Sequence, residues 1–331
     1  MRLVELLAAT ATALLVSSFV SGSAHAVLVG ADAGRASPLP SAESAGRTLI
    51  GAEVLGTPYA PHRPQDTARY ISPRPAKSYT SKPENGRCIS HFAVTDQTRC
   101  TFGDLRSHTT IFLVGDSHVM QWEPALKVAA RQHGWKLVTD AKWACPFNAR
   151  EVLLGHHEYA SCLQWNRTVL HTVLHAHPTL VLTSAMKYRV ADANGHPLSY
   201  ARSKPHLVAG YEKWWRRLHR RGIPITVLAD TPKPDFDIDG CVAAHRNHLR
   251  ACARDKSRYS WQGGQALAQA AKRTAFVHRL SFNDLLCPWE RCPAVLADIL
   301  LWRGHSNHIT ATYAYTAKRQ VAHRLAAVLR R

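Results

Sequence analysis

The sequence predicts an α/β fold, with a central parallel sheet covered by helices on both faces. Short apolar runs such as residues 110–114 and 179–184 are typical of strands buried in a parallel sheet. Longer segments with the apolar period of a helix, such as 120–133 and 162–175, alternate with these runs. Because parallel strands need long crossover connections, this alternation indicates strands joined by covering helices.

The expected elements follow one another regularly along the chain. Strands are expected at 110–114, 136–140, 179–184, 224–229 and 275–280, helices at 120–133, 162–175, 206–221, 263–273 and 310–329, and a further apolar run at 295–301. Ligands of such sheets bind outside the carboxyl ends of the strands. We therefore look for a site at that edge.

The stretch from Thr109 to Ala130 carries the main motif of the chain. Its strand ends at Gly115, and Asp116, Ser117 and His118 follow before the helix. A serine held there exposes its hydroxyl at a helix N-terminus, where backbone N–H groups stabilise an oxyanion. The alternative is that the aspartate and the serine only cap the helix. A second polar stretch near the other end of the chain, residues 305–310, favours the first interpretation because it contains a histidine that can serve as a base.

These ordered motifs resemble the SGNH-hydrolase superfamily. More narrowly, they are similar to the SGNH domain that lies outside the membrane in acyltransferase-3-type polysaccharide O-acetyltransferases. The motifs that carry the resemblance are Gly115-Asp116-Ser117-His118, Gln121-Trp122-x-Pro124-Ala125-Leu126, Trp143-Ala144-Cys145-Pro146, Cys162-x-x-Trp165, Asp230-Thr231-Pro232 and residues 306–314. The resemblance implies a three-layer flavodoxin-like (SGNH hydrolase) fold. It also implies a secreted serine esterase or O-acyltransferase that handles O-acetyl groups on cell-envelope carbohydrate.

The resemblance assigns roles to several residues. Ser117 becomes the nucleophile that carries the acyl group, and His308 becomes the general base. The oxyanion hole should include the backbone N–H of Ser117. The Gly and Asn that the superfamily adds are not evident here, so the Ala144 N–H and the Ser184 side chain are positional candidates. His118 belongs to the motif, but the sequence gives it no chemical role.

The chain departs from the family pattern at His305. The family usually has an Asp three residues before its catalytic histidine, and such a carboxylate orients the imidazole and stabilises the imidazolium. Three outcomes stay open. A backbone carbonyl orients His308 in a working dyad, which is the interpretation we favour; another carboxylate, such as Asp298 or Asp230, reaches it; or the enzyme is weak or inactive.

A second functional class fits the same departures. The chain would then be a catalytically weak or silent carbohydrate-binding relative. Aromatic side chains that stack on sugar rings would be supplied by Trp143, Trp165, Trp214 and Trp215. Such tryptophans are also common core residues, so labelling of Ser117 by a serine-directed phosphonate separates the two classes.

The chain divides into three segments. Residues 1–26 have one Arg, an apolar run and a small-x-small end at Ala24-His25-Ala26, which predicts a secretory signal peptide and hence a secreted, extracytoplasmic protein. Residues 27–85 are rich in Pro, Ala and Ser, and we expect a linker or an N-terminal wrap. Residues 86–331 form the SGNH-like domain. No other segment is apolar enough to span a membrane.

Eight cysteines in a secreted chain predict disulfides. They fall into four local couples, and we expect each couple to be bonded, although spacing alone leaves other connectivities open: Cys88/Cys100, Cys145/Cys162, Cys241/Cys252 and Cys287/Cys292. Zinc is the competing use of cysteine. Because the chain has no C-x-x-C pair and its 20 histidines are scattered, we expect no metal and no other cofactor.

The formal net charge of +19 predicts an anionic partner. Arg216-Arg217 and Arg220-Arg221 also invite a nucleic-acid interpretation. However, the chain has no known nucleic-acid module, and its predicted signal peptide directs it away from nucleic acid. We therefore expect an acidic or neutral envelope glycan as partner and no nucleic acid. We expect a monomer, with acyl groups supplied by a separate membrane donor protein or released to water.

Overall fold

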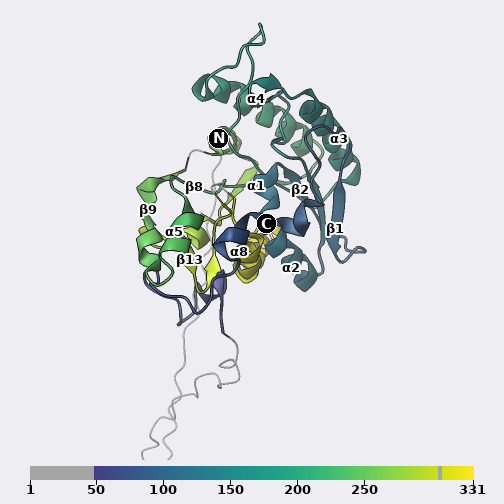
Figure 1. Cartoon of the computed structure of the whole chain (residues 1–331). Coiled ribbons are helices and arrows are strands. Elements are labelled where there is room, and N and C mark those ends of the chain that lie inside the picture. Colours follow the sequence, from purple (N-terminus) through teal and green to yellow (C-terminus); the bar gives the residue numbers. More distant parts are fainter. Residues whose placement is uncertain (1–47, 262, 305–307) are drawn as a thin grey trace, which may run out of the picture. The chain divides into compact units, whose positions relative to one another are not determined.

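A six-stranded sheet with strand order β1-β3-β2-β6-β7-β11 forms the centre of the fold (Figure 1). Its strands are β1 (Arg99–Gly103), β2 (Thr110–Gly115), β3 (Lys136–Ala141), β6 (Leu180–Ser184), β7 (Ile225–Leu228) and β11 (Val277–Leu280). All neighbouring pairs are parallel except β1 and β3. Renumbered in chain order, the five parallel strands run 2-1-3-4-5, which is the flavodoxin-like order. The predicted fold class is confirmed.

This computed structural model describes residues 48–261, 263–304 and 308–331. Within it, Leu49–Arg331 form one compact unit. The predicted signal peptide and His305 lie outside the described residues. None of the described helices is long and apolar enough to cross a bilayer.

The central strand β2 is buried on both faces, as its uninterrupted apolar sequence predicts. Ile111 and Leu113 point into one hydrophobic core, whereas Phe112 and Val114 point into the other. Side chains alternate between the faces of a strand, so one apolar run serves both cores. The two cores must therefore be closed by helices on both sides of the sheet.

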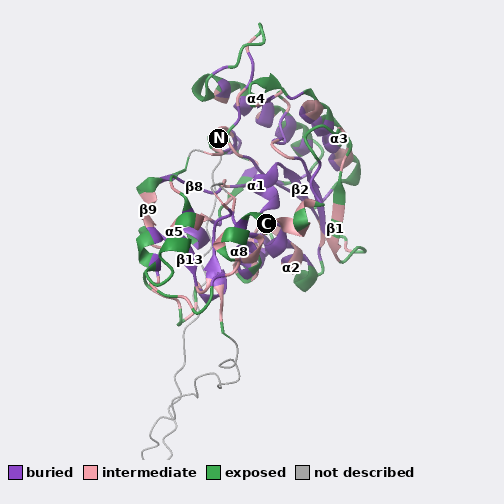
Figure 2. Ribbon diagram, viewed as in Figure 1, coloured by how far each residue is buried: buried purple, intermediate pink, exposed green. Residues whose placement is uncertain are grey.

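Helices cover both faces (Figure 1). The Ile111 side packs against α1 (Ser117–Met120), α2 (Glu123–His133), α5 (Ile238–Ala244), α7 (Asn283–Leu286), α8 (Ala311–Thr316) and α9 (Lys318–Leu329). The Phe112 side packs against α3 (Ala160–Ala176), α4 (Tyr200–His219) and α6 (Gln265–Arg273). Figure 2 shows α1 buried, while the outer surfaces of α3 and α4 are exposed. Short hairpins complete the fold: β4 (Leu153–Leu154) with β5 (His157–Glu158), β8 (Lys233–Pro234) with β10 (Tyr259–Ser260), β9 (Arg254–Asp255) with β12 (Arg291–Cys292), and β13 (Val295–Leu296) with β14 (Ile299–Leu300).

Several predicted boundaries were wrong. The helix expected at 120–133 is divided, because the chain turns at Gln121 and Trp122 between the end of α1 at Met120 and the start of α2 at Glu123. The helix expected at 206–221 begins at Tyr200, where the Ser199 side chain accepts a hydrogen bond from the Arg202 N–H. The apolar run 295–301 is the β13–β14 hairpin, and the helix expected at 310–329 is divided at Ala317 into α8 and α9.

Residues 49–86 contain three 3-10 helices: η2 (Gly51–Val54), η3 (Pro75–Thr80) and η4 (Pro83–Gly86). The start of this segment packs on the C-terminal helices. The Ala52 N–H donates to Thr316 Oγ1 at 2.9 Å, and Gln320 Nε2 donates to the Ala52 carbonyl at 2.7 Å. The Lys127 side chain on α2 pairs with Glu84, which holds η4 against the domain.

All four expected disulfides are present: Cys88–Cys100, Cys145–Cys162, Cys241–Cys252 and Cys287–Cys292. No free cysteine remains in the described part of the chain. Four disulfides are typical of a protein that folds outside the reducing cytosol.

Candidate active site

The turn after β2 places Ser117 at the carboxyl edge of the sheet, where it is buried. Gly115 has φ 138°, and a Cβ there would lie 2.7 Å from the Ser184 carbonyl, so only glycine fits this close approach. Asp116 caps α1, because its Oδ1 accepts from the His118 N–H at 2.8 Å. The capping role considered from the sequence therefore belongs to Asp116, and Ser117 is left for other chemistry.

The structure brings Ser117 and His308 together. His308 Nε2 lies 2.8 Å from Ser117 Oγ, although 191 residues separate the two in sequence. The His308 backbone is held by the Arg303 N–H, which donates to its carbonyl at 2.9 Å. A neutral imidazole at this distance is placed to accept the serine proton. Both residues that the resemblance singled out thus share one site.

A second histidine pairs with a carboxylate beside this couple. His118 Nδ1 contacts Asp230 Oδ1, and the Thr231 N–H donates to the same oxygen at 2.9 Å. The centroids of the His118 and His308 rings are 4.6 Å apart. Asp230 follows β7, so its position at the carboxyl edge of the sheet follows from the topology.

Asp230 and Asp298 are the two carboxylates that the sequence offered as partners of His308, and they lie in different surroundings. Asp230 contacts His118 and reaches the neighbourhood of His308 through that ring. Asp298 lies in the β13–β14 turn, where its Oδ1 accepts from the Arg69 N–H at 3.0 Å. His305 lies outside the described residues, and its role stays a prediction.

Gln121 connects the three segments that carry these side chains. Its Nε2 donates to the His118 carbonyl at 3.0 Å and to Thr231 Oγ1 at 3.2 Å. Its Oε1 accepts from the Ile309 N–H at 2.9 Å. The Gln121 amide is buried. Only Gln and Asn carry a side-chain amide, which has both an NH₂ donor and a carbonyl acceptor. The sequence places Gln121 in a motif but does not indicate this role.

Asp116 uses its second oxygen to hold the loop that follows β6. Its Oδ2 accepts from the Met186 N–H at 3.0 Å and from the Tyr188 hydroxyl at 2.5 Å. Burial, reinforced by the Asp116 charge, raises the pKa of Tyr188 well above its usual value, so the phenol stays a donor. Asp116 is therefore a structural anchor beside the serine.

Burial sets the electrostatics of His308. Desolvation lowers the pKa of His308 well below its usual value, and positive charge on His118 when protonated, on Arg303 and on Lys82 acts in the same direction. The imidazole is therefore a neutral base at physiological pH. Burial also raises the pKa of Asp230, and its contact with His118 opposes that rise.

The two positional candidates for the oxyanion hole lie at the same edge. Ser184 is the last residue of β6 and pairs in register with Gly115. Ala144 follows β3 and has φ 48°, a left-handed conformation that is uncommon for alanine. Lys142, two residues earlier, is buried and donates through Nζ to the carbonyls of His91 at 2.6 Å and Phe92 at 2.9 Å. Lys142 thereby fixes the backbone that leads to Ala144, a role the sequence did not indicate.

A small pocket is lined by Ser117 and His308. The residues that line it come from η4 and its flanks, from α1 and the turn after it, from the loop after β3 and from the segment before α8. They are Lys82, Pro83, Gly86, Ile89, Ser117, Met120, Gln121, Trp143, Arg303 and His308. Its cavity volume is about 10 Å³, which is room for about one water molecule. The pocket thus fits a small group at the serine.

Three of the four candidate sugar-stacking tryptophans are core residues, which is the more common role that the sequence also allowed. Trp165, Trp214 and Trp215 are buried in the core on the Phe112 side of the sheet. Their apolar surface packs against α3, α4 and the sheet, so it is not offered to a ligand. Trp143 alone among the four lines the pocket.

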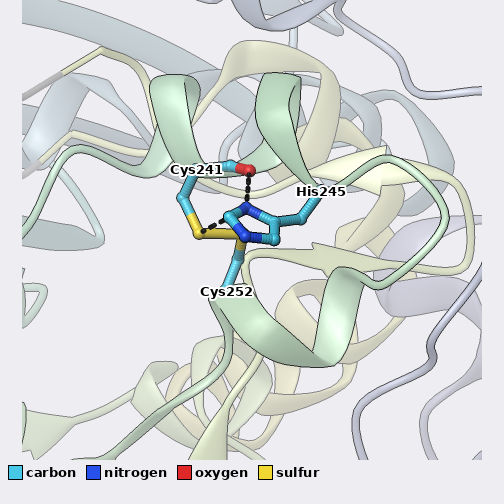
Figure 3. A group of neighbouring side chains, drawn as sticks. All are labelled: Cys241, His245 and Cys252. Atoms are coloured by element: carbon cyan, nitrogen blue, oxygen red, sulfur yellow. Dashed lines mark hydrogen bonds between the residues drawn. A yellow bond between two sulfur atoms is a disulfide. The ribbon is translucent and has the colours of Figure 1, made fainter.

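One group of side chains among the described residues has metal-ligand spacing: Cys241, His245 and Cys252. The two cysteines are bonded to each other, and His245 Nδ1 lies 2.9 Å from the Cys241 carbonyl (Figure 3). A disulfide sulfur is not a thiolate, so the oxidised group offers a metal only the histidine.

The fold and the site define an α/β protein with a serine–histidine couple at the carboxyl edge of a flavodoxin-like sheet. The family model of the SGNH domain (fused to AT3 domains) matches residues 87–323. The chain therefore belongs to this SGNH domain family.

Two solved structures resemble the chain at low identity. One is the periplasmic domain of a lipopolysaccharide acetyltransferase from Salmonella ser. Paratyphi A, with TM-score 0.47, 11% identity, and coverage of 73% of this chain and 87% of that chain. The other is a proposed acylhydrolase from Bacteroides fragilis NCTC 9343, with TM-score 0.37, 10% identity, and coverage of 69% and 91%. No curated protein matches the chain. At these values neither structure adds to what the family match establishes.

Proposed function

We propose that this protein is a secreted serine esterase or O-acyltransferase that handles O-acetyl groups on cell-envelope carbohydrate. The observation that carries the proposal is the 2.8 Å contact between Ser117 Oγ and His308 Nε2 at the carboxyl end of β2. A serine hydroxyl is a poor nucleophile alone, and an adjacent neutral imidazole is its usual activator.

The reaction proceeds through an acyl-serine intermediate. Ser117 Oγ attacks the ester carbonyl while His308 Nε2 takes the hydroxyl proton. When the C–O bond to the leaving alcohol breaks, His308 returns that proton to the alcohol. Water or a glycan hydroxyl then attacks the acyl carbon, giving its proton to His308, and Ser117 leaves with that proton. Hydrolysis and transfer differ only in the second nucleophile.

The His118–Asp230 pair supports the charge that forms on His308. During each transfer His308 becomes an imidazolium in a buried site. An ionised Asp230 bonded to a neutral His118 places a negative charge one ring away. At an effective dielectric constant of about 20, opposite unit charges separated by one ring attract by on the order of a few kcal/mol. The pair thus performs part of the task of the family's usual aspartate.

The size of the pocket supports a short acyl group. An acetyl methyl fits a space of this kind. The four disulfides support an extracytoplasmic location. We expect the acyl donor to be a separate membrane protein and the acceptor to be a glycan.

The decisive experiment uses the purified mature chain and a chromogenic acetyl ester. We expect turnover and labelling by a serine-directed phosphonate, both lost in Ser117→Ala. Ser260→Ala, which alters an exposed serine in β10, is the matched control and should retain both. Adding a glycan acceptor then separates transfer from hydrolysis. Turnover that persists in Ser117→Ala would exclude the acyl-serine route, and glycan binding without phosphonate labelling would identify the silent binding relative instead.

A further inference from the structure

A second and larger pocket lies beside the serine site, at the same edge of the sheet. It has a volume of about 350 Å³, within the range of small-ligand sites. Its walls come from the loop after β6, the first turns of α4 and the start of α6: Lys187, Tyr188, Tyr200, Ala201, Lys204, Leu207, Gln265 and Ala266. We call it the basic pocket.

The basic pocket shares a wall with the serine turn. Tyr188 lines the pocket, and its hydroxyl donates to Asp116 Oδ2 at 2.5 Å. Asp116 directly precedes Ser117 in the chain. On the α6 side, a Cβ on Gly263 would lie 1.6 Å from Asp230 Oδ2, so glycine permits this loop to pack on Asp230. Tyr188 and the Gly263 loop therefore connect the basic pocket to two carboxylates of the serine site.

Two lysines, Lys187 and Lys204, line the basic pocket, and Arg189 lies beside its Tyr200 ring. Lys187 Nζ lies 4.5 Å from the centroid of the exposed Tyr200 ring, and the Arg189 guanidinium carbon lies 5.7 Å from it. Arg189 is also fixed by donation from Nη2 to the Gly155 carbonyl at 2.8 Å. Lys204 adds a third cation, one turn after Tyr200 on α4. Tyr200 thus gathers positive charge at the mouth through cation–π contacts.

The neighbouring acids pair with other residues. Asp192 contacts His196 at 3.7 Å. Glu212 contacts Arg216 and Arg273, each at 3.4 Å. In the part of the chain that the structure describes, no ion pair neutralises Lys187 or Lys204. A neutral sugar gains little from such a surface, whereas a carboxylate or a phosphate gains charge-assisted hydrogen bonds.

We propose that the basic pocket binds an anionic sugar residue of the acceptor glycan and so presents a neighbouring hydroxyl to the acyl-serine. The ligand class is a carboxylate- or phosphate-bearing saccharide. This inference rests on the proposed function for the identity of the acceptor, but binding itself is measured without turnover. The net charge of +19 would add long-range attraction for the same polyanion.

The test is calorimetric titration of the full mature chain with three oligosaccharides of matched length. Oligogalacturonate supplies carboxylates, glycerol-phosphate oligomers supply phosphates, and a malto-oligosaccharide is neutral. We expect both anions, or one of them, to bind and the neutral oligomer not to. Binding should weaken as ionic strength rises from about 50 to about 200 mM, because salt screens surface charge. The tighter anion identifies the chemical source.

Two double variants separate the pocket from general charge. Lys187→Gln with Lys204→Gln should weaken anion binding at least tenfold, with an unchanged thermal midpoint. Lys213→Gln with Lys272→Gln removes the same charge from exposed positions further along α4 and α6 and should change affinity less than twofold. Equal weakening by both pairs, equal binding of the neutral oligomer, or no binding of either anion would overturn the inference. Ester turnover without anion binding overturns only this inference, and anion binding without turnover overturns only the proposed function.

Discussion

The His118 ring lies 4.6 Å, centroid to centroid, from the ring of His308. One histidine is in contact with the hydroxyl of Ser117, and the other with a buried carboxylate. Two imidazoles so close together couple their charges, so the state of one affects how readily the other takes a proton. This pair is the main difference between the site and a simple serine–histidine dyad.

Asp230→Asn tests that coupling. It removes the negative charge and keeps a hydrogen-bonding side chain, so the imidazolium of His308 is less favoured. We expect kcat to fall by a factor of about 10 to 100, equivalent to about 1.4–2.8 kcal/mol in the barrier, with little change in KM. Burial already lowers the pKa of His308, so the activity of the wild type should fall only at a pH below the usual titration range of histidine. In the variant, the acidic limb of the pH–rate profile should move to a still lower pH.

The control for Asp230→Asn is Asp298→Asn, which alters the carboxylate that contacts Arg69. Its pH–rate profile should match that of the wild type. An acidic limb that stays in place in Asp230→Asn, with kcat intact, would show that Asp230 has no influence on His308.

Gln121→Met tests the connection between the three segments of the site. The substitution keeps the volume and removes the hydrogen bonds to the Ile309 N–H, the His118 carbonyl and Thr231. We expect a loss of about 1–3 kcal/mol in the free energy of unfolding. Phosphonate labelling of Ser117 should also slow at least tenfold at temperatures where the variant is fully folded.

Slower labelling in the folded variant separates a positioning role from a merely structural one. Gln164→Met, at an exposed position on α3, is the matched control and should label at the wild-type rate. Normal labelling in a destabilised Gln121→Met would restrict Gln121 to a structural role.

Glu123→Gln should stabilise the protein at neutral and alkaline pH. Glu123 is buried, and desolvation raises its pKa from 4.5 to about 7, although Lys127 Nζ lies 3.4 Å away. The folded carboxyl therefore holds its proton to a higher pH than the unfolded one, so stability falls as pH rises from about 4.5 to 7. Glutamine removes this penalty, roughly 1–3 kcal/mol at about pH 8.

Chemical denaturation at about pH 5 and about pH 8 measures this effect. The gain should be larger at the higher pH, and Glu158→Gln, at an exposed position in β5, should show none. A loss of stability at the higher pH would mean that the Glu123–Lys127 contact outweighs the cost of burying the charge.

His305→Asp restores the family's usual carboxylate three residues before His308. This prediction depends on the sequence pattern, because position 305 lies outside the described residues. We expect kcat to rise by a factor of about 10 to 100, equivalent to about 1.4–2.8 kcal/mol in the barrier. The rise should be larger in the Asp230→Asn background, since the two carboxylates would then replace one another.

Stopped-flow measurement of acylation, with His156→Asp as a control at an exposed turn, gives these rates. Equal or lower activity in His305→Asp, with the fold intact, would show that His305 has a different task.

The sequence predicted the parallel strands well because each is a short apolar run between helical periods. It missed β1, an antiparallel edge strand with the sequence Arg-Cys-Thr-Phe-Gly, whose partly exposed residues lack an apolar pattern. The strand is specified instead by pairing with β3 and by the Cys88–Cys100 disulfide. Such contacts are not local, so no window of sequence contains them.

The same reason limits prediction of the site. Ser117 and His308 were found because each stands in a motif. The pairing of His118 with Asp230 spans 112 residues, and neither motif names the other as a partner. Lys142 looks like an ordinary surface residue in sequence, yet the structure buries it against carbonyl groups. Only the assembled sheet edge shows these relationships.

The wall that η4 contributes to the serine pocket has an evolutionary consequence. Lys82, Pro83 and Gly86 line that pocket, yet they precede the SGNH match, which begins at residue 87. Part of the pocket wall therefore lies on a stretch that precedes the matched domain, whereas Met120, Trp143 and Arg303 line the pocket from within that domain. Sequence change in the leading stretch would therefore reshape that part of the wall while Ser117 and His308 stayed unaltered.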